Sequence, residues 1–433
     1  MTRYTWMFAA GAAALFLTAC QEPEVILVGE REDLFEQAEK TENQSPALRL
    51  SSQSRNAAWT HRIGTQKYRV ANAALSQRPT LAWSASIGQA ESRKNRITAD
   101  PVMADGKIFT VDALATVSAT NTAGETLWSK DLTPSRDKAG QASTGGLAYG
   151  NGTLFVTTGY GSLRALDPAS GADLWEQEFQ AVGSGSPTVY GDLVYAVSGD
   201  ATGWALEAKT GRVAWQLISI PTVQNIQSPA APAVTDRYAI FPYGSGEIQA
   251  AFRQGGVARW TASLSETLPG RSINTIGDIS SDPVVAGNTI YVGNHSGRLA
   301  ALDIETGARK WTADYGALSP VFPAGGSLFL VSERNELLRL NASTGERIWG
   351  QQLPQFVSSK PRKQSEMHAH YGPVMAGGQL VVASSDELIR FYDPQSGALT
   401  YTVELPHGAA TNPIVAGGVL YVVNRKGELY AFR

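Results

Sequence analysis

The side chains of this chain that could do chemistry are one cysteine, a close pair of histidines and a set of repeated aspartates. His368 and His370 lie two residues apart, so they would share a face if they lie on a strand. A metal site would need further ligands, and no acidic cluster or third histidine is near them in the sequence. We therefore favour a loop or partner-facing role for the pair, with metal binding as the alternative.

The repeated aspartates include Asp167, Asp303 and Asp393, each followed by two residues, a serine or threonine and a glycine. A carboxylate at this position can accept backbone N–H groups of a tight turn, which accounts for these residues without an active site. No Walker loop, G-x-S-x-G or H-E-x-x-H pattern occurs in the sequence. We therefore predict no catalytic residues, no metal and no cofactor.

Cys20, the single cysteine, ends a segment typical of a bacterial lipoprotein signal peptide. Arg3 precedes an apolar run from Trp6 to Phe16, which is too short to span a bilayer comfortably. Leu17-Thr18-Ala19-Cys20 looks like a lipobox, in which the cysteine is acylated and becomes the first mature residue; the alternative is an ordinary signal peptide with a chance cysteine. Gln21 follows in place of the aspartate that retains lipoproteins at the inner membrane, which favours the outer membrane.

Composition points to an all-β protein. The chain has 43 glycines, 21 prolines and 10 tryptophans, and only 17% of its residues are charged, so turns and aromatic packing are abundant. A net charge of -3 argues against nucleic acid as a partner. With Cys20 acylated, no thiol remains for a disulfide, so packing alone must stabilise the fold.

Residues 20–78, which follow the signal peptide of residues 1–19, show no sustained periodicity and are expected to form a flexible tether. One short helix near residues 30–38 is the regular element we expect there, within an acidic group of Glu30, Glu32, Asp33 and Glu36. A mildly basic stretch follows, which is either solvated or in contact with phospholipid head groups or an acidic partner. It consists of Arg55, His61, Arg62, Lys67 and Arg69.

A fifteen-residue frame recurs along residues 79–433. Gly161–Trp175 and Gly297–Trp311 show it most clearly, with alternating strand residues, an aspartate, a glycine and a final aromatic. This pattern predicts a β-hairpin whose aromatic side chain lies on the second strand. Further copies end at Trp128, Trp215, Trp260, Trp349 and Tyr401. In each copy a glycine stands four residues before the aromatic: Gly124, Gly171, Gly211, Gly256, Gly307, Gly345 and Gly397.

A second strand pair lies upstream of each frame, as in Pro283–Val292 and Pro413–Val422, so each repeat holds four strands. The aromatic residues are 38 to 52 residues apart, which is the period of a β-propeller blade. Eight upstream pairs occur, but the last repeat ends at Arg433 without its fourth strand. We expect the strand around Trp83 to complete it, which gives a closed, eight-bladed β-propeller of four-stranded antiparallel blades.

The frame Ala-Leu-Asp-x-x-Thr-Gly-x-x-x-Trp resembles the repeat of quinoprotein alcohol dehydrogenases and their relatives. Combined with the lipobox, tether and eight blades, the chain resembles the BamB family, lipoproteins of the outer-membrane β-barrel assembly machinery, over residues 1–433. The resemblance implies a non-catalytic scaffold that faces the periplasm and is held at the outer membrane by its lipid anchor alone. Its implied partners are the POTRA domains of the barrel-inserting subunit BamA, other subunits of the complex and unfolded outer-membrane client proteins.

The resemblance also implies a partner-binding surface on two loops, Ile220–Gln227 and Arg271–Ser281. The chain departs from the family here, because Gln227 replaces an arginine and Ser280 replaces an acidic residue. Ile226 and Ile279 flank prolines and strand starts, so either could simply belong to the core. The implied contact residues are Ile220, Val223, Gln224, Ile226, Gln227, Arg271, Asp278 and Ser280.

Two other functions remain open from the sequence. A quinoprotein dehydrogenase would hold pyrroloquinoline quinone and calcium with carboxylate and amide oxygens, and a general-base aspartate would serve the reaction. The family's disulfide of adjacent cysteines is impossible with a single cysteine. The third possibility is a propeller that binds cell-wall glycan or another envelope protein.

Overall fold

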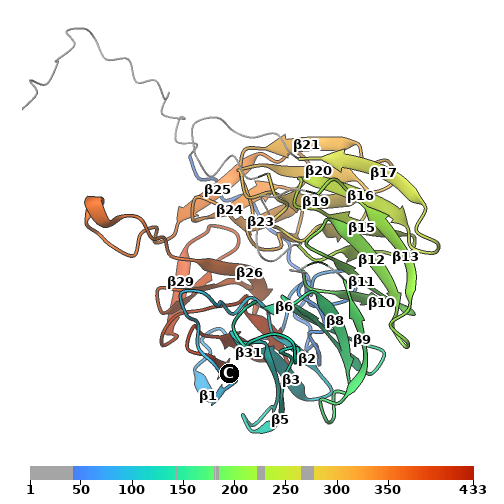
Figure 1. Ribbon diagram of the computed structural model, residues 1–433. Helices are drawn as coiled ribbons and strands as arrows, with labels where there is room; N and C mark the ends of the chain where they lie inside the picture. Colours follow the sequence, from blue (N-terminus) through green and yellow to red (C-terminus); the bar gives the residue numbers. More distant parts are fainter. Residues whose placement is uncertain (1–41, 143, 180, 182–184, 222–229, 265–276) are drawn as a thin grey trace, which may run out of the picture. The chain divides into compact units, whose positions relative to one another are not determined.

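Eight four-stranded antiparallel sheets are arranged as the blades of a β-propeller (Figure 1). The computed structural model describes residues 42–142, 144–179, 181, 185–221, 230–264 and 277–433. The predicted fold class, the number of blades and their four-stranded construction are confirmed. The innermost strands are mostly buried, and most of the outermost strands alternate between exposed and half-buried residues, as β5 (Thr126–Asp131) does. No helix among the described residues is long and apolar enough to cross a membrane.

The strands are given from the innermost to the outermost in each blade. Blades 1 to 4 are β2 (Val102–Ala104), β3 (Lys107–Val111), β4 (Thr116–Asn121), β5 (Thr126–Asp131); β6 (Thr144–Gly150), β7 (Thr153–Thr158), β8 (Ser162–Leu166), β9 (Asp173–Glu178); β10 (Thr188–Tyr190), β11 (Leu193–Val197), β12 (Thr202–Glu207), β13 (Val213–Ile218); and β14 (Ala233–Val234), β15 (Tyr238–Pro242), β16 (Glu247–Phe252), β17 (Ala258–Ser263). Blades 5 to 8 are β18 (Val284–Ala286), β19 (Thr289–Gly293), β20 (Leu299–Asp303), β21 (Arg309–Ala313); β22 (Phe322–Ala324), β23 (Ser327–Val331), β24 (Glu336–Asn341), β25 (Arg347–Gln352); β26 (His370–Ala376), β27 (Gln379–Ser384), β28 (Leu388–Tyr392), β29 (Leu399–Glu404); and β30 (Ile414–Ala416), β31 (Val419–Val423), β32 (Glu428–Phe432), β1 (Leu81–Ser86).

The frame tryptophans join neighbouring blades. Trp128 on β5 donates its indole N–H to the carbonyl oxygen of Pro168 in the next blade, at 3.2 Å. Gly171 of that blade has φ +73°, and a Cβ there would lie 2.7 Å from the Trp128 ring. The glycine thus permits both the left-handed turn and the close approach of the ring. The same joint recurs at Trp83, Trp175, Trp215, Trp260, Trp311 and Trp349, so the predicted packing role of these residues is confirmed.

The ring is closed by strands from the two ends of the propeller. β1 pairs antiparallel with β32, with Leu81 opposite Phe432 and Ser86 opposite Glu428. Backbone N–H groups of Thr80 and Arg433 each donate to the other residue's carbonyl oxygen at 2.9 Å. The prediction that the strand around Trp83 completes the last blade is therefore confirmed.

Residues 42–78 do not form the flexible tether that we expected. Trp59 and Ala73 are fully buried, and Val70 and Leu75 are buried beside them in the core of the last blades. The segment carries no strand or helix period because backbone hydrogen bonds and single side chains, rather than a repeated apolar face, hold it against different blades. We call residues 54–77 the plug.

Candidate partner-binding surface

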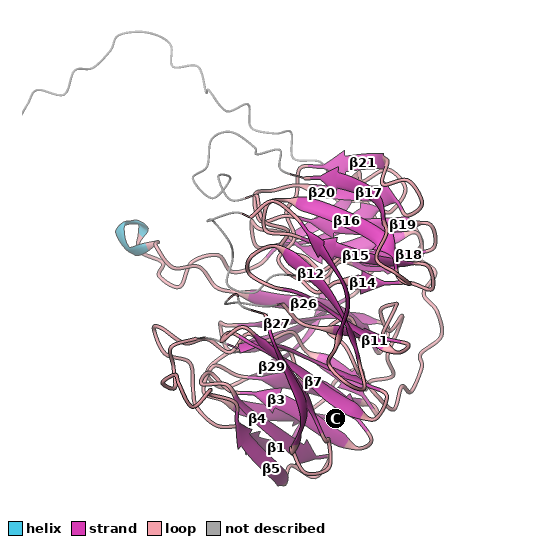
Figure 2. Ribbon diagram, turned by 45° about the vertical axis from the view of Figure 1, so that its right-hand side comes forward, coloured by secondary structure: helices cyan, strands magenta, loops and turns pink. Residues whose placement is uncertain are grey.

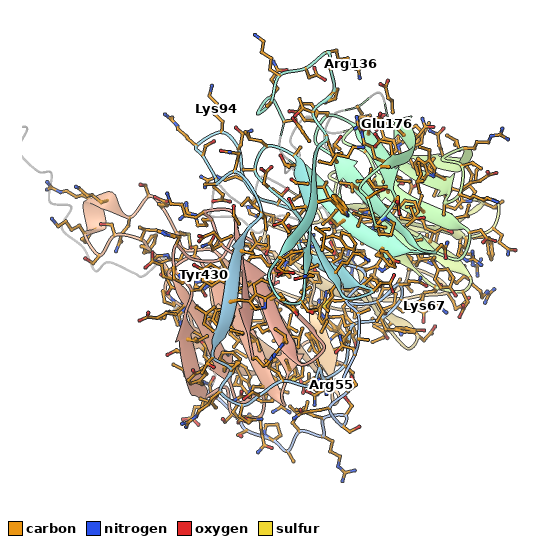
Figure 3. All side chains as sticks on the ribbon, turned by 90° about the horizontal axis from the view of Figure 1, so that it is seen from below. Arg55, Lys67, Lys94, Arg136, Glu176 and Tyr430 are labelled. Carbon is orange, nitrogen blue, oxygen red and sulfur yellow. The ribbon has the colours of Figure 1, made fainter. Side chains whose placement is uncertain are left out.

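The connections of the propeller divide between two faces. Strands alternate in direction within a blade, so links between successive blades lie on one face, and the tight turns after the inner strands lie on the other. We call these the loop face and the turn face. Lys94 and Arg136 belong to loop-face connections, and Figure 3 shows them on the side opposite Arg55 and Lys67 of the plug.

The two loops predicted to bind a partner follow β13 and β17 in the chain, and the described residues next to these strands lie on the loop face. Ile220 is 72% exposed, and its neighbour Ile218 at the end of β13 is exposed as well. Two exposed isoleucines at the start of a loop form the kind of apolar anchor that protein interfaces use. Val223, Gln224, Ile226, Gln227 and Arg271 lie outside the described residues, as do Cys20 and the helix expected near residues 30–38.

The end of the second loop is directed into the protein. Asp278 is only 3% exposed, and its carbonyl oxygen accepts the backbone N–H of His295 at 3.1 Å. Ser280 donates its hydroxyl to the carbonyl oxygen of Ala317 at 2.7 Å. Ile279 is buried in the cluster between the fourth and fifth blades, so the core alternative holds for it. Among the described members of the predicted set, Ile220 alone therefore presents a large exposed side chain.

The plug enters the central channel from the turn face and bonds to inner strands around the ring. At the turn face, the backbone N–H groups of Gly377 and Gly417 donate to the carbonyl oxygens of Ala73 and Asn56 in the plug. Its backbone and side chains then reach the innermost strands of five blades. These bonds join Asn56 to Val415, Trp59 to Met103, Thr60 to Tyr149, His61 to Val189 and Ala73 to Met375.

Arg62 lies at the tip of the plug and holds two carboxylates from opposite sides of the channel. Its Nε donates to Oδ2 of Asp100 and its Nη1 to Oδ1 of Asp282, both at 3.0 Å. Burial opposes the charge on Arg62, but the two carboxylates outweigh it and raise its pKa. Asp100 in turn accepts the backbone and side-chain N–H groups of Asn412, and Asp282 accepts the backbone N–H of Ala231. We call Arg62, Asp100 and Asp282 the ionic node.

Arg69 completes the charged interior of the plug. It donates to the carbonyl oxygens of Pro320 and Pro373, at 3.0 and 3.2 Å, and its guanidinium stacks over the ring of Phe322. Burial lowers its pKa to about 9, so it remains charged at neutral pH. Of the basic stretch, Lys67 pairs with Asp236 on the turn face at 2.6 Å. The expectation that the whole stretch is solvated or touches a membrane is therefore wrong for His61, Arg62 and Arg69.

Because His61 is buried, we predict that the free energy of unfolding depends on pH. Burial lowers the pKa of His61 from 6.5 to about 3. Its Nε2 accepts the backbone N–H of Val189 at 2.9 Å. The unfolded chain binds more protons than the folded one between these values, so this stabilisation is complete above pH 6.5 and is lost as the pH falls toward 3. We expect His61→Gln to show a shallower loss of stability over this range in urea denaturation. An unchanged pH slope would contradict this role.

A cavity of about 610 Å³ opens on the loop face above the plug. Arg62, Asp100 and Asn412 line its buried end, and the exposed side chains of Leu318, Val357 and Met367 line its rim. The cavity therefore lies directly above the ionic node at the tip of the plug. Its volume falls in the range of small-ligand and peptide-side-chain sites.

The two histidines singled out in the sequence have different surroundings. His370 begins β26 and is buried, with Nδ1 2.7 Å from the Ser384 hydroxyl and Nε2 2.8 Å from the carbonyl oxygen of Pro354. Both ring nitrogens are therefore engaged, and a loop or partner-facing role is wrong for His370. His368 is half-buried and lines the cavity. The described residues contain no group of three or more side chains that could hold a metal ion.

The repeated aspartates have the turn role expected of them. Oδ1 of Asp167 accepts the N–H of Ala169, Oδ1 of Asp303 accepts that of Glu305, and Oδ2 of Asp393 accepts that of Ser396. The hydrogen bond from the Ser170 hydroxyl lowers the pKa of Asp167 most, and the backbone hydrogen bonds lower it further. These carboxylates are at turns on the outside of the ring, away from the cavity.

Comparison with known proteins gives the family. The family model described as "Outer membrane protein assembly factor BamB" matches residues 113–351 and 350–433. The outer membrane protein assembly factor BamB of Shewanella oneidensis is 25% identical over 362 residues, which cover 81% of this chain and 88% of that protein.

Solved structures show the same fold. The crystal structure of BamB from Moraxella catarrhalis matches with a TM-score of 0.68 and 20% identity, over 82% of this chain and 99% of that one. The quinohemoprotein alcohol dehydrogenase of Comamonas testosteroni matches with a TM-score of 0.63 and 14% identity, over 88% of this chain and 81% of that one. The propeller is therefore shared with enzymes, whereas the family model and the sequence relative both point to assembly factors. The chain belongs to the BamB family of outer membrane protein assembly factors.

Proposed function

We propose that this protein is a non-catalytic scaffold of the outer-membrane β-barrel assembly complex that binds the POTRA domains of BamA. Its loop-face connections, residues 220–227 and 271–281, carry the contact, and unfolded outer-membrane proteins are its clients. The observation that carries this proposal is the family membership together with the exposed Ile218 and Ile220 at the start of the first loop. Apolar anchors of this kind supply most of the binding energy at protein interfaces.

The proposal extends to the position of the protein in the cell. Residues 1–19 are the signal peptide, and Cys20 carries the acyl chains that hold the protein on the periplasmic side of the outer membrane. Residues 79–433 form the propeller, with the plug anchored in its channel. A non-catalytic role is supported by the frame aspartates, whose oxygens are used in turns, and by the buried ionic node in the channel.

The test is binding to a purified POTRA-domain fragment of BamA, measured by pull-down and by titration. We expect Ile220→Glu and Ile226→Glu each to weaken binding by about tenfold or more, because a charge would replace an apolar anchor. Leu174→Glu is the matched control, since Leu174 is also exposed but lies on the outer strand β9. Asp278→Arg is a poor test because burial of Asp278 couples it to the fold. Unchanged binding in both isoleucine variants would place the contact elsewhere.

A further inference from the structure

Residues 354–369, between β25 and β26, form an arm that projects from the propeller (Figures 1 and 2). Phe356 and Met367 face each other as an antiparallel bridge, and Val357 donates its N–H to the carbonyl oxygen of Glu366 at 3.0 Å. A short 3-10 helix, η2 (Pro361–Lys363), makes the tip. The arm is therefore a two-stranded stem with a compact end.

The base of the arm is fixed to the loop face. Nδ2 of Asn335 donates to the carbonyl oxygens of Pro354 and His368, which lie at the two ends of the stem, at 3.2 and 2.9 Å. Asn335 has a positive φ of 57° in the turn between β23 and β24, which directs this side chain at the arm. Ala369 also exchanges hydrogen bonds with Ser385 of the next blade. These contacts place the stem beside the cavity.

The stem exposes apolar side chains where a soluble hairpin would carry polar ones. Val357 is 52% exposed and Met367 45% exposed, and Phe356 is exposed beside them. Val357 and Met367 also line the cavity, together with the exposed Leu318 from the link before β22. The apolar stem and the cavity rim thus form one continuous surface, of the kind that marks an interaction site.

The tip of the arm is cationic. Lys360, Arg362 and Lys363 are all exposed, and none of the three forms an ion pair with a described residue. Glu366 is the acidic residue of the arm, and its side chain lies at the cavity. The partner surface that complements the arm therefore combines apolar side chains with negative charge.

We propose that the arm and the cavity rim bind an extended polypeptide segment whose apolar side chains are flanked by acidic ones. An extended chain can follow the stem, place one side chain in the cavity and pair its carboxylates with the tip. A flat anionic bilayer would meet the cations of the tip but could not reach Val357 and Met367, which are set back at the rim. The arm lies after the sixth blade and the loops predicted to bind POTRA domains lie after the third and fourth, so this site does not depend on the proposed function.

The probe is a fluorescein-labelled synthetic peptide with a leucine–valine–phenylalanine run between pairs of aspartates, titrated against the full-length protein by fluorescence anisotropy. We expect the triple variant Lys360→Glu, Arg362→Glu, Lys363→Glu to weaken binding roughly tenfold, and added salt to do the same. Val357→Asp should weaken it by a similar factor without a change in the net charge of the tip. The matched control is Lys209→Glu with Arg212→Glu, two exposed cations near a turn-face hairpin.

Methionine methyl NMR locates the contact directly. The peptide should shift the Met367 signal and leave those of the buried Met103 and Met375 unchanged. Equal affinity for the arm variants, or for a peptide with lysines in place of aspartates, would overturn the proposal. So would arm-dependent binding to anionic phospholipid vesicles without peptide binding, or arm-dependent self-association in sedimentation without peptide binding.

Discussion

Replacement of Arg62 by methionine is expected to lower the free energy of unfolding by about 3–5 kcal/mol. The guanidinium bonds Asp100 and Asp282 at 3.0 Å each, and all three side chains are largely buried. Methionine fills a similar space but leaves two carboxylates without a countercharge at the centre of the channel. Urea denaturation at neutral pH, followed by tryptophan fluorescence, measures the loss.

Two further variants separate the ionic node from general effects of losing an arginine. Arg237→Met is the matched surface control, because its pair with Glu305 is at 3.1 Å but both side chains are exposed, so the expected cost is below about 1 kcal/mol. Asp282→Asn added to Arg62→Met removes one uncompensated charge and should restore part of the stability. If Arg62→Met costs no more than Arg237→Met, backbone hydrogen bonds alone hold the plug.

The propeller could be predicted because its packing repeats. Seven of the eight blades pack a tryptophan against a glycine turn of the next blade, so the same residue types recur seven times in the sequence. The closure of the ring could also be predicted, because the last repeat lacks a fourth strand and the strand around Trp83 has no other blade. The repeat in the sequence therefore predicts both the number of blades and the strand that closes the ring.

The plug could not be predicted from a pattern because each of its contacts occurs once. His61 accepts a hydrogen bond from β10, Arg62 forms ion pairs with two carboxylates, and Arg69 donates to two proline carbonyl oxygens. A sequence pattern does not show that a basic residue is paired when its partner lies more than 200 residues away in the chain, as Asp282 does from Arg62. Trp59, which is buried, is the one residue that indicates a packed segment in the sequence, because a large aromatic side chain is unfavourable in a solvated tether.

The partner surface was predictable only as far as loop position. Each predicted loop links the outermost strand of one blade to the innermost strand of the next. That position alone does not distinguish Asp278, which is buried shortly before β18, from Ile220, which is exposed just after β13. The arm had a sequence signal of its own. Trp349 and Tyr401 are 52 residues apart against 38 for the preceding pair, so an insertion had to lie between those two blades.

Substitution of Trp83 by alanine is expected to cost about 3–5 kcal/mol and, in addition, to make the protein aggregate. Nε1 of Trp83 donates to the carbonyl oxygen of Thr122 at 3.0 Å, and the ring packs against Gly124 and lies 6.0 Å from the Tyr421 ring. The contact with Tyr421 packs β1 against the last blade, and the contacts with Thr122 and Gly124 join it to the first blade. When β1 detaches, the N–H and C=O groups along the edge of β32 are left open to pairing with another chain.

Trp128→Ala is the matched variant because it deletes the same joint, with Pro168 as the lost acceptor, from a blade whose four strands are continuous in the chain. We expect both variants to unfold at lower urea concentrations by a similar amount, and Trp83→Ala alone to form light-scattering aggregates under conditions where most molecules remain folded. The difference follows from topology, since β5 stays next to β4 through a short turn while β1 is linked to β32 by packing and hydrogen bonds only. Equal aggregation of the two variants would mean that exposed core surface, rather than the opened edge of β32, drives association.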